Sequence, residues 1–431
     1  MRADRHAVVL PFQKGEAVKR PILPFLPTAP VRLPIVRMGE NGARLLVQAD
    51  THVTVGQILA EGGDGAPVLS TVDGVLTGTV VLTHPRFGEL TCIELLPDLA
   101  APTADDAPAD ASADVSTAAP GAEMTAQQIL AAARRAAICD ERDGRLLADK
   151  LAGWQLPADD PSAQRCVLVA DGTENDIFGS AAWAVLEETP QQVLDGLRLA
   201  ARALHFPHCH IAALLPKRRL RALRRAVGRD TVFVTENTYP LPAYADKKQE
   251  AFVIGAQACA ALWRAVATGE GATHVVVTVG GDGVPESANV RVPYGTDIGE
   301  LLSAYGADPA AECVLGDAMT GIACPDVHTP LLPGADTVLS LAHPFSRTAG
   351  PCMGCGRCAA VCHAGLLPYE IARRLENMHY ERLQHLDAQA CDGCGACSYV
   401  CPAGRQVTDE VLAAADSRGT MLISFGGEND E

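Results

Sequence analysis

Two runs of cysteine near the end of the chain have the spacing of metal ligands. The first, Cys352 to Cys362, reads C-x2-C-x2-C-x3-C, and the same pattern returns at Cys391 to Cys401 after 28 intervening residues. Such spacing suits a [4Fe–4S] cube, because two-residue spacers let consecutive thiolates converge and small residues between them leave room. Zinc is the alternative, but zinc sites usually use two separated cysteine pairs. The pattern predicts two [4Fe–4S] clusters that transfer single electrons.

The two runs are expected to share their ligands. In two-cluster bacterial ferredoxins the fourth cysteine of each run binds the other cluster. On this pattern the ligands of the first cluster are Cys352, Cys355, Cys358 and Cys401, and those of the second are Cys391, Cys394, Cys397 and Cys362. The second run ends in Cys-Pro, whereas His363 replaces proline after the first. The spacer is helical in character, which favours a helical ferredoxin domain.

Charge and composition exclude some classes of protein. The chain has 431 residues and a formal net charge of −17, so nucleic acid is not an expected partner. Its basic stretch, 217–225, is predicted to be the polar face of an amphipathic helix. The start of the chain lacks a signal-peptide pattern and the seven other cysteines are scattered, from which we expect a reducing cytoplasm. Apolar runs are too short for membrane insertion, so any peripheral attachment would need a partner.

The first part of the chain is predicted to be β-structure followed by a linker. Residues 1–97 alternate short strands with Gly and Pro turns, and 51–80 resemble a biotinyl/lipoyl-type barrel-sandwich hybrid. That module carries its prosthetic group on a lysine, yet no lysine occurs between Lys19 and Lys150, so we expect a purely structural module. Residues 98–123 are rich in Ala, Asp and Pro and are predicted to be a disordered acidic linker.

The remainder changes from alternating helices and strands to a cysteine-rich segment. The alternation over 124–268 predicts a parallel α/β domain of Rossmann-like type. Residues 269–335 suit a small β-grasp unit, 344–410 the two-cluster domain, and 411–431 a C-terminal tail. The fold class is therefore multidomain, α/β plus β.

In this order, the segments resemble the RnfC family, relatives of the flavin subunit of NADH dehydrogenase. The matching stretches include the barrel-sandwich, "LVADGTENDIFGSAAWAVLEET", "VRVPYGTDIGELLSAYG", "VLGDAMTGIA" and the cysteine runs. The resemblance implies a flavin-subunit-like α/β domain and an SLBB-like β-grasp unit. It also implies a subunit of a membrane ion-translocating complex that oxidises NADH with FMN.

One loop departs from that family. Where flavin-binding members have a glycine-rich loop, residues 136–151 read "AAICDERDGRLLADKL". Glycines there let backbone N–H groups approach the flavin phosphate. This chain retains only Gly144 and adds Asp140, Glu141 and Asp143, carboxylates expected to repel a phosphate. The loop argues against FMN and NADH and leaves Gly144 and Glu174 as the candidate flavin-side residues.

Three functions remain from the sequence. The first is an iron–sulfur protein that exchanges electrons with a partner reductase, as in the proline reductase-associated branch (PrdC), for which D-proline reductase is the candidate partner. The second is a true RnfC subunit; a docking subunit without catalysis is a third. The sequence leaves open whether the chain is itself an oxidoreductase. Cys139, at the start of the altered loop, is a candidate redox thiol, and an ordinary structural cysteine is the alternative.

Overall fold

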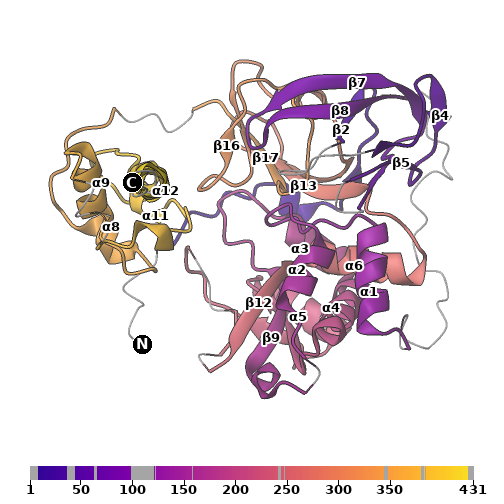
Figure 1. Ribbon diagram of the computed structural model, residues 1–431, viewed down its shortest axis with the longest axis horizontal. Coiled ribbons are helices and arrows are strands. Elements are labelled where there is room, and N and C mark those ends of the chain that lie inside the picture. Colours follow the sequence, from indigo (N-terminus) through magenta and orange to yellow (C-terminus); the bar gives the residue numbers. More distant parts are fainter. Residues whose placement is uncertain are drawn as a thin grey trace, which may run out of the picture.

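The computed structural model describes residues 8–35, 44–62, 66–98, 121, 123–157, 159–240, 244–246, 248–343, 348–379, 383 and 385–425, with the backbone alone for 417–425. The predicted linker 98–123 lies almost wholly outside them. A β-rich layer lies on an α/β layer, and a small helical unit stands to one side of both (Figure 1). The fold is thus mixed α/β with several sheets.

Two small antiparallel sheets form the first β-structure. One has the order β2-β8-β7-β4 and the other β3-β5-β6. Their bounds are β2 Val31–Pro34, β3 Arg44–Leu45, β4 Thr51–Val53, β5 Ile58–Glu61, β6 Pro67–Leu69, β7 Gly74–His84 and β8 Gly88–Pro97. Buried and more exposed side chains alternate along β7, as expected where one face is covered. The barrel-sandwich label stays a prediction.

A six-stranded mixed sheet shares its core with this β-structure. Its order is β1-β14-β13-β17-β15-β16, and α7 packs with it. The bounds are β1 Leu23–Pro24, β13 His274–Gly280, β14 Ala288–Pro293, α7 Ile298–Ala304, β15 Glu312–Leu315, β16 Ile322–Ala323 and β17 Thr337–Leu341. Leu76 and Val277 belong to one apolar cluster. Of its strands, β1 comes from within the predicted module 1–97, and β17 follows residue 335, where the predicted β-grasp unit ends.

The α/β layer contains a four-stranded sheet of order β11-β10-β9-β12. All its pairings are parallel, which is the arrangement that the alternation of helices and strands predicts. Its strands are β9 Cys166–Gly172, β10 His208–Ala213, β11 Val232–Val234 and β12 Glu250–Gly255. Its helices are α1 Ala126–Arg135, α2 Leu147–Trp154, α3 Ala181–Glu188, α4 Pro190–Leu204, α5 Lys217–Val227 and α6 Ala256–Ala267. Thr125 closes a capping box on α1, and Pro190 begins α4.

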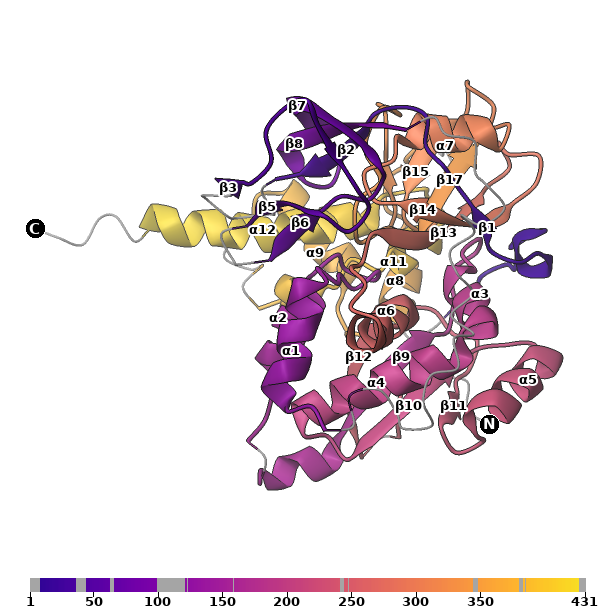
Figure 2. The same cartoon turned by 90° about the vertical axis from the view of Figure 1, so that its right-hand side faces the viewer.

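Short helices build the cysteine-rich unit. They are α8 Arg357–Val361, α9 Pro368–Glu376, α11 Ala396–Tyr399 and α12 Val407–Phe425, with a 3-10 turn at Ala388–Ala390. Two further 3-10 segments lie outside this unit, Ala17–Lys19 before β1 and Pro161–Arg165 before β9. Val411 and Ala414 of α12 are buried with Ile371 and Leu383 in the core of this unit. Helix α12 therefore continues from the predicted two-cluster domain, 344–410, into the predicted tail, 411–431. In Figure 2 the end of α12 extends beyond the other elements.

Candidate metal centre

The second cysteine run lines a pocket together with the last cysteine of the first run. Cys362, Cys391, Cys394 and Cys397 are among the side chains that line it. Glycine positions the thiols: Gly354, Gly356, Gly393 and Gly395 have φ between 67° and 78°. Only glycine adopts this left-handed conformation readily, so these positions require the backbone freedom of glycine as well as its small size.

The first run lies beside the end of the second. The backbone N–H of Gly350 donates to the carbonyl of Ala403 at 2.8 Å, which holds the segment before Cys352 against the segment after Cys401. Cys352 and Cys355 are exposed, and Cys358 is buried at the start of α8. The backbone thus brings the segment after Cys401 next to the first run, and Cys362 lines a pocket with the second run. The crossed ligand assignment stays a prediction.

Burial shapes the chemistry of these thiols. It raises the pKa of Cys394 to about 12 and that of Cys397 to about 11. A hydrogen bond with Thr408 lowers the pKa of Cys397 by less than burial raises it. Metal binding must therefore displace protons from both thiols. His363, which stands where proline was expected, pairs with Asp392 at 2.8 Å, and both could bind one metal ion with Cys394. This alternative uses a cluster cysteine, so the two kinds of site exclude each other.

The second run also faces the rest of the protein. The Tyr239 hydroxyl donates to the carbonyl of Cys394 at 2.6 Å. A Cβ on Gly395 would collide with the carbonyl of Met319, so the backbones are in close contact there. Leu10 and Ala396 complete a small apolar cluster with Tyr239. The second run is thus the inner end of the unit, and exposed Cys352 and Cys355 form its outer end.

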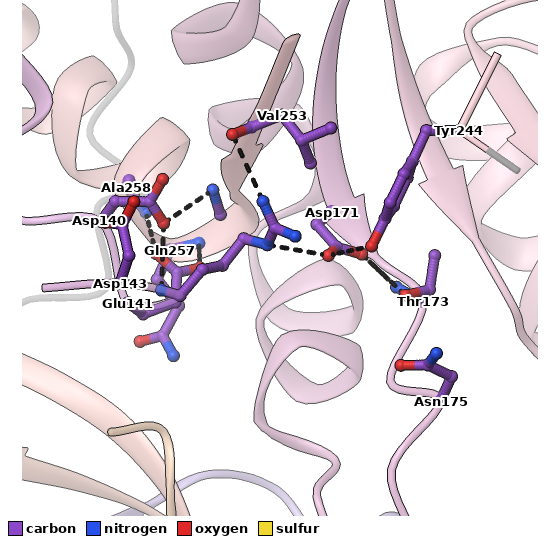
Figure 3. A network of polar contacts seen from close by, with 12 residues as sticks. Asp140, Glu141, Asp143, Asp171, Thr173, Asn175, Tyr244, Val253, Gln257 and Ala258 are labelled. Carbon is purple, nitrogen blue, oxygen red and sulfur yellow. Dashed lines mark hydrogen bonds and ion pairs between the residues drawn. The ribbon is translucent and has the colours of Figure 1, made fainter. Parts of the chain in front are cut away.

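The acidic side chains of the altered loop form hydrogen bonds with the start of α6. The Glu141 carboxylate accepts the backbone N–H groups of Gln257 at 2.6 Å and Ala258 at 3.0 Å, in the first turn of α6 (Figure 3). Asp140 accepts the N–H of Gly255 at 3.1 Å and forms a buried ion pair with Lys150. Repulsion of a phosphate was the predicted role of these carboxylates, but two of the three are buried and bind the chain itself.

Flavin phosphate does not fit at this helix start. Helix N-termini bind anions through free N–H groups and the helix dipole. Here the Glu141 carboxyl group accepts those N–H groups and lies at the end of the helix dipole. A Cβ on Gly255 would overlap this carboxyl group. Burial raises the pKa of Glu141 to about 8, Asp140 adds to the rise, and the N–H of Gln257 opposes it. An internal carboxyl group occupies the position that an anionic ligand would need.

Arg142 closes the neighbouring sheet edge. Its Nε lies 3.0 Å from Asp171 Oδ2, at the carboxyl end of β9, and Tyr244 donates its hydroxyl to the same carboxylate at 2.8 Å (Figure 3). The guanidinium lies 5.8 Å from the Tyr244 ring centre. Ligands of parallel sheets bind at the carboxyl ends of strands. Side chains of this protein occupy that edge here.

The other predicted site residues do not converge. Cys139 is buried with Ala66 and Leu146, and its Sγ lies 3.7 Å from the carbonyl of Ala137. Gly144 packs against the backbone of Pro333 with φ 75°. Glu174 accepts the N–H of Ala182 at the start of α3. Their predicted roles stay predictions.

Lys14 is a buried charged residue near Glu174 that the sequence did not single out. It is 2% exposed, donates to the carbonyls of Asp176 and Gly179, and lies among the carboxyl groups of Glu174 and Asp336. Burial raises the pKa of Glu174 to about 8 and that of Asp336 to about 6, with like charges adding to both. A single lysine in the N-terminal stretch carries no sequence signal of such burial.

Comparison with known proteins supports the prediction of an iron–sulfur domain. Residues 351–405 match a 4Fe-4S dicluster domain. An ion-translocating oxidoreductase complex subunit from Rhodobacter capsulatus is 27% identical over 234 residues, 48% of this chain and 45% of that protein. The subunit of the same name from Pseudomonas aeruginosa is 35% identical over 117 residues, 26% of this chain and 15% of that protein. The chain therefore spans less than half the length of these relatives.

Solved structures are similar at a lower level. Two structures of an NAD+-reducing [NiFe]-hydrogenase, in the H2-reduced and air-oxidised states, match 71% and 66% of this chain and 67% and 60% of theirs. Identities are 15% and 17%, with TM-scores of 0.42 and 0.44, too low to argue from. The sequence relatives and the dicluster match confirm the predicted RnfC-like iron–sulfur protein. In the described part of the chain, no helix has the length and apolar character to cross a bilayer.

Proposed function

We propose that this chain is an electron-transfer protein that holds two [4Fe–4S] clusters and exchanges single electrons with a partner protein. The observation that supports the proposal is the proximity of the two cysteine runs: Cys362 lines a pocket with the second run, and Gly350 is hydrogen-bonded to Ala403. Cys352, Cys355, Cys358 and Cys401 would hold one cluster, and Cys391, Cys394, Cys397 and Cys362 the other. When bound, the clusters supply one-electron reduction and oxidation.

The closed loop supports a role without flavin. Glu141 occupies the start of α6, and Arg142 with Tyr244 covers the sheet edge at Asp171. NADH oxidation through FMN would need both places open. Electrons would therefore enter and leave through protein partners, and exposed Cys352 and Cys355 mark the end of the unit that such a partner can approach.

The name of the relatives favours one kind of partner. They are subunits of an ion-translocating oxidoreductase complex, so a membrane complex is a candidate partner, with this chain on its cytoplasmic side. A reductase such as D-proline reductase is the other candidate, and it suits the loss of the flavin loop. The third candidate, a docking subunit, would bind such a partner without exchanging electrons with it.

Anaerobic purification tests the proposal directly. About eight irons and eight sulfides per chain are expected, and fewer than about four irons with zinc present would overturn it. Denaturation should release no yellow flavin, and NADH should not reduce the clusters. Release of FMN with NADH-driven dye reduction would instead establish the flavin-containing RnfC function. Affinity purification of the tagged chain from its own cells then separates the two candidate partners.

A further inference from the structure

Two cysteines outside the metal centre lie opposite each other on neighbouring strands. Strands β15 and β16 are antiparallel, with Val314 opposite Ala323, so the next opposed positions are Cys313 and Cys324. The N–H of Cys324 donates to the carbonyl of Cys313 at 2.8 Å. Both residues are buried. The hairpin therefore places two thiols side by side, away from the cluster ligands.

The two thiols are chemically distinct. A hydrogen bond joins their side chains, and the Sγ of Cys324 also lies 3.0 Å from the carbonyl of Asp326. The bond from Cys313 lowers the pKa of Cys324 to about 7, whereas the same bond and burial raise the pKa of Cys313. The thiolate is the reactive form of cysteine, and Cys324 reaches it near neutral pH. The lowered pKa of Cys324 favours it as the attacking thiol, and Cys313, joined to it by a hydrogen bond, can then resolve the adduct.

Their placement meets the geometric need of a disulfide. Residues opposite each other in a hydrogen-bonded antiparallel pair have Cα atoms about 5.5 Å apart. Disulfides span roughly 4.4–6.8 Å between Cα atoms. We propose that Cys313 and Cys324 form a cross-strand dithiol that a two-electron thiol oxidant converts to a disulfide without rearrangement of the hairpin.

The reaction balances with a diazene oxidant such as diamide. The Cys324 thiolate adds to the N=N bond and forms an S–N bond. The Cys313 sulfur then attacks Cys324 Sγ, so the S–S bond forms and the S–N bond breaks. The diazene leaves as a hydrazine with two electrons and two protons, and dithiothreitol reverses the change.

The hairpin connects this dithiol with the metal centre. Its loop, residues 316–321, carries Met319, whose carbonyl touches Gly395 between two cluster cysteines. Ala318 in the loop donates its N–H to Asp176 at 3.2 Å. A disulfide at the base of the hairpin would hold this loop more firmly against the inner end of the cysteine-rich unit. The inference stands on the hairpin alone and does not depend on the proposed function.

Peptide mapping of the intact, anaerobic protein tests the proposal. After treatment with diamide and blocking of free thiols, cleavage before aspartate gives fragments 308–316 and 317–325, each with one of the two cysteines. We expect the fragments to be joined after oxidation and to separate with dithiothreitol. Cys259, which is buried in α6, is the control. It should remain a free thiol during oxidation and react with the alkylating agent once the protein is unfolded.

Two variants and one further measurement complete the test. C313S and C324S should each abolish the joined species, and amide hydrogen exchange over 316–321 should slow on oxidation of the wild type only. Recovery of both fragments fully alkylated from oxidised wild type would overturn the proposal. Joining of either fragment to another cysteine peptide in place of its partner would overturn it as well. The wild-type result is decisive even if a variant fails to fold.

Discussion

The carboxylate of Glu141 accepts the backbone N–H of Gln257 at 2.6 Å, although the two residues are 116 positions apart. Ala258 adds a second N–H to the same carboxylate. Through these bonds the loop that replaces a glycine-rich sequence becomes the cap of α6. The protein thus retains a helix start of the kind that binds anions, and the Glu141 side chain fills it.

The first prediction concerns pH. Because the pKa of Glu141 is raised to about 8 in the folded protein and is about 4.3 when unfolded, the folded state holds an extra proton between these values. Stability from this group is therefore lost as pH rises from about 4 to 8, by up to about 1.4 kcal/mol per pH unit. E141Q, which mimics the protonated acid, should flatten this decline.

Urea unfolding between pH 5 and 9 measures the effect. The three tryptophans, Trp154, Trp183 and Trp263, all lie in helices of the α/β layer, so their fluorescence reports on that layer. Glu174 keeps its own pH dependence in the variant, so the slope should fall without vanishing. E270Q, at an exposed glutamate, is the control. Parallel curves for E141Q and wild type would contradict the assignment.

The second prediction concerns the buried ion pair of Lys150 and Asp140. Both side chains are at most 4% exposed. K150M leaves a buried carboxylate without its cation, which costs about 3–5 kcal/mol in such positions. The same fluorescence measurement at pH 7 should show this loss. K19M removes the exposed pair with Glu16 and should cost at most about 1 kcal/mol. An equal effect of the two variants would show that the Lys150 pair is not buried in solution.

Local patterns predicted the parts of the fold that depend on neighbouring residues. The capping box at Thr125, the proline at the start of α4 and the strand–helix alternation all have short-range signals. The pairing of β1 with β14 has no short-range signal, because it joins Leu23 to Val290, which lie far apart in the sequence. The position of β17 has no local signal either, since long-range pairing with β13 and β15 places it in the sheet.

The candidate site shows the same division. Cysteine spacing is local, so it predicted the iron–sulfur domain that the dicluster match supports. The inward orientation of Glu141 depends on α6, more than a hundred residues away, so the sequence could show the carboxylates but not their partners. Lys14 and Tyr239 were missed because single residues of ordinary type acquire their roles only through tertiary packing.

The third prediction separates the two ligand sets. C362S should remove the cluster of the second run, and C401S that of the first, each lowering iron from about eight to about four per chain. Spectra of the remaining cluster should therefore agree between C362S and C391S, and between C401S and C355S. Electron paramagnetic resonance of the reduced proteins provides the comparison. If C362S instead matched C355S, each run would bind its own cluster.

The fourth prediction concerns the hydrogen bond from Tyr239 to Cys394. Y239F removes the donor of a bond between the α/β layer and the second cysteine run, with a net cost of about 0.5–1.5 kcal/mol. Amide hydrogen exchange over 391–397 should become faster. Y399F alters an exposed tyrosine of the same unit and should leave exchange unchanged. Equal exchange in Y239F and wild type would show that the bond does not hold the unit in place.

The last prediction tests the closest helix contact in the α/β layer. Gly196 of α4 faces the backbone of α6, where a Cβ would overlap the carbonyl of Cys259. G196A must push the helices apart, and overpacking of this kind costs about 1–3 kcal/mol. Gly153 of α2 has open space around it, so G153A should stabilise by about 0.5–1 kcal/mol through helix propensity. Urea unfolding followed by tryptophan fluorescence should give shifts of opposite sign, and shifts of the same sign would refute the contact.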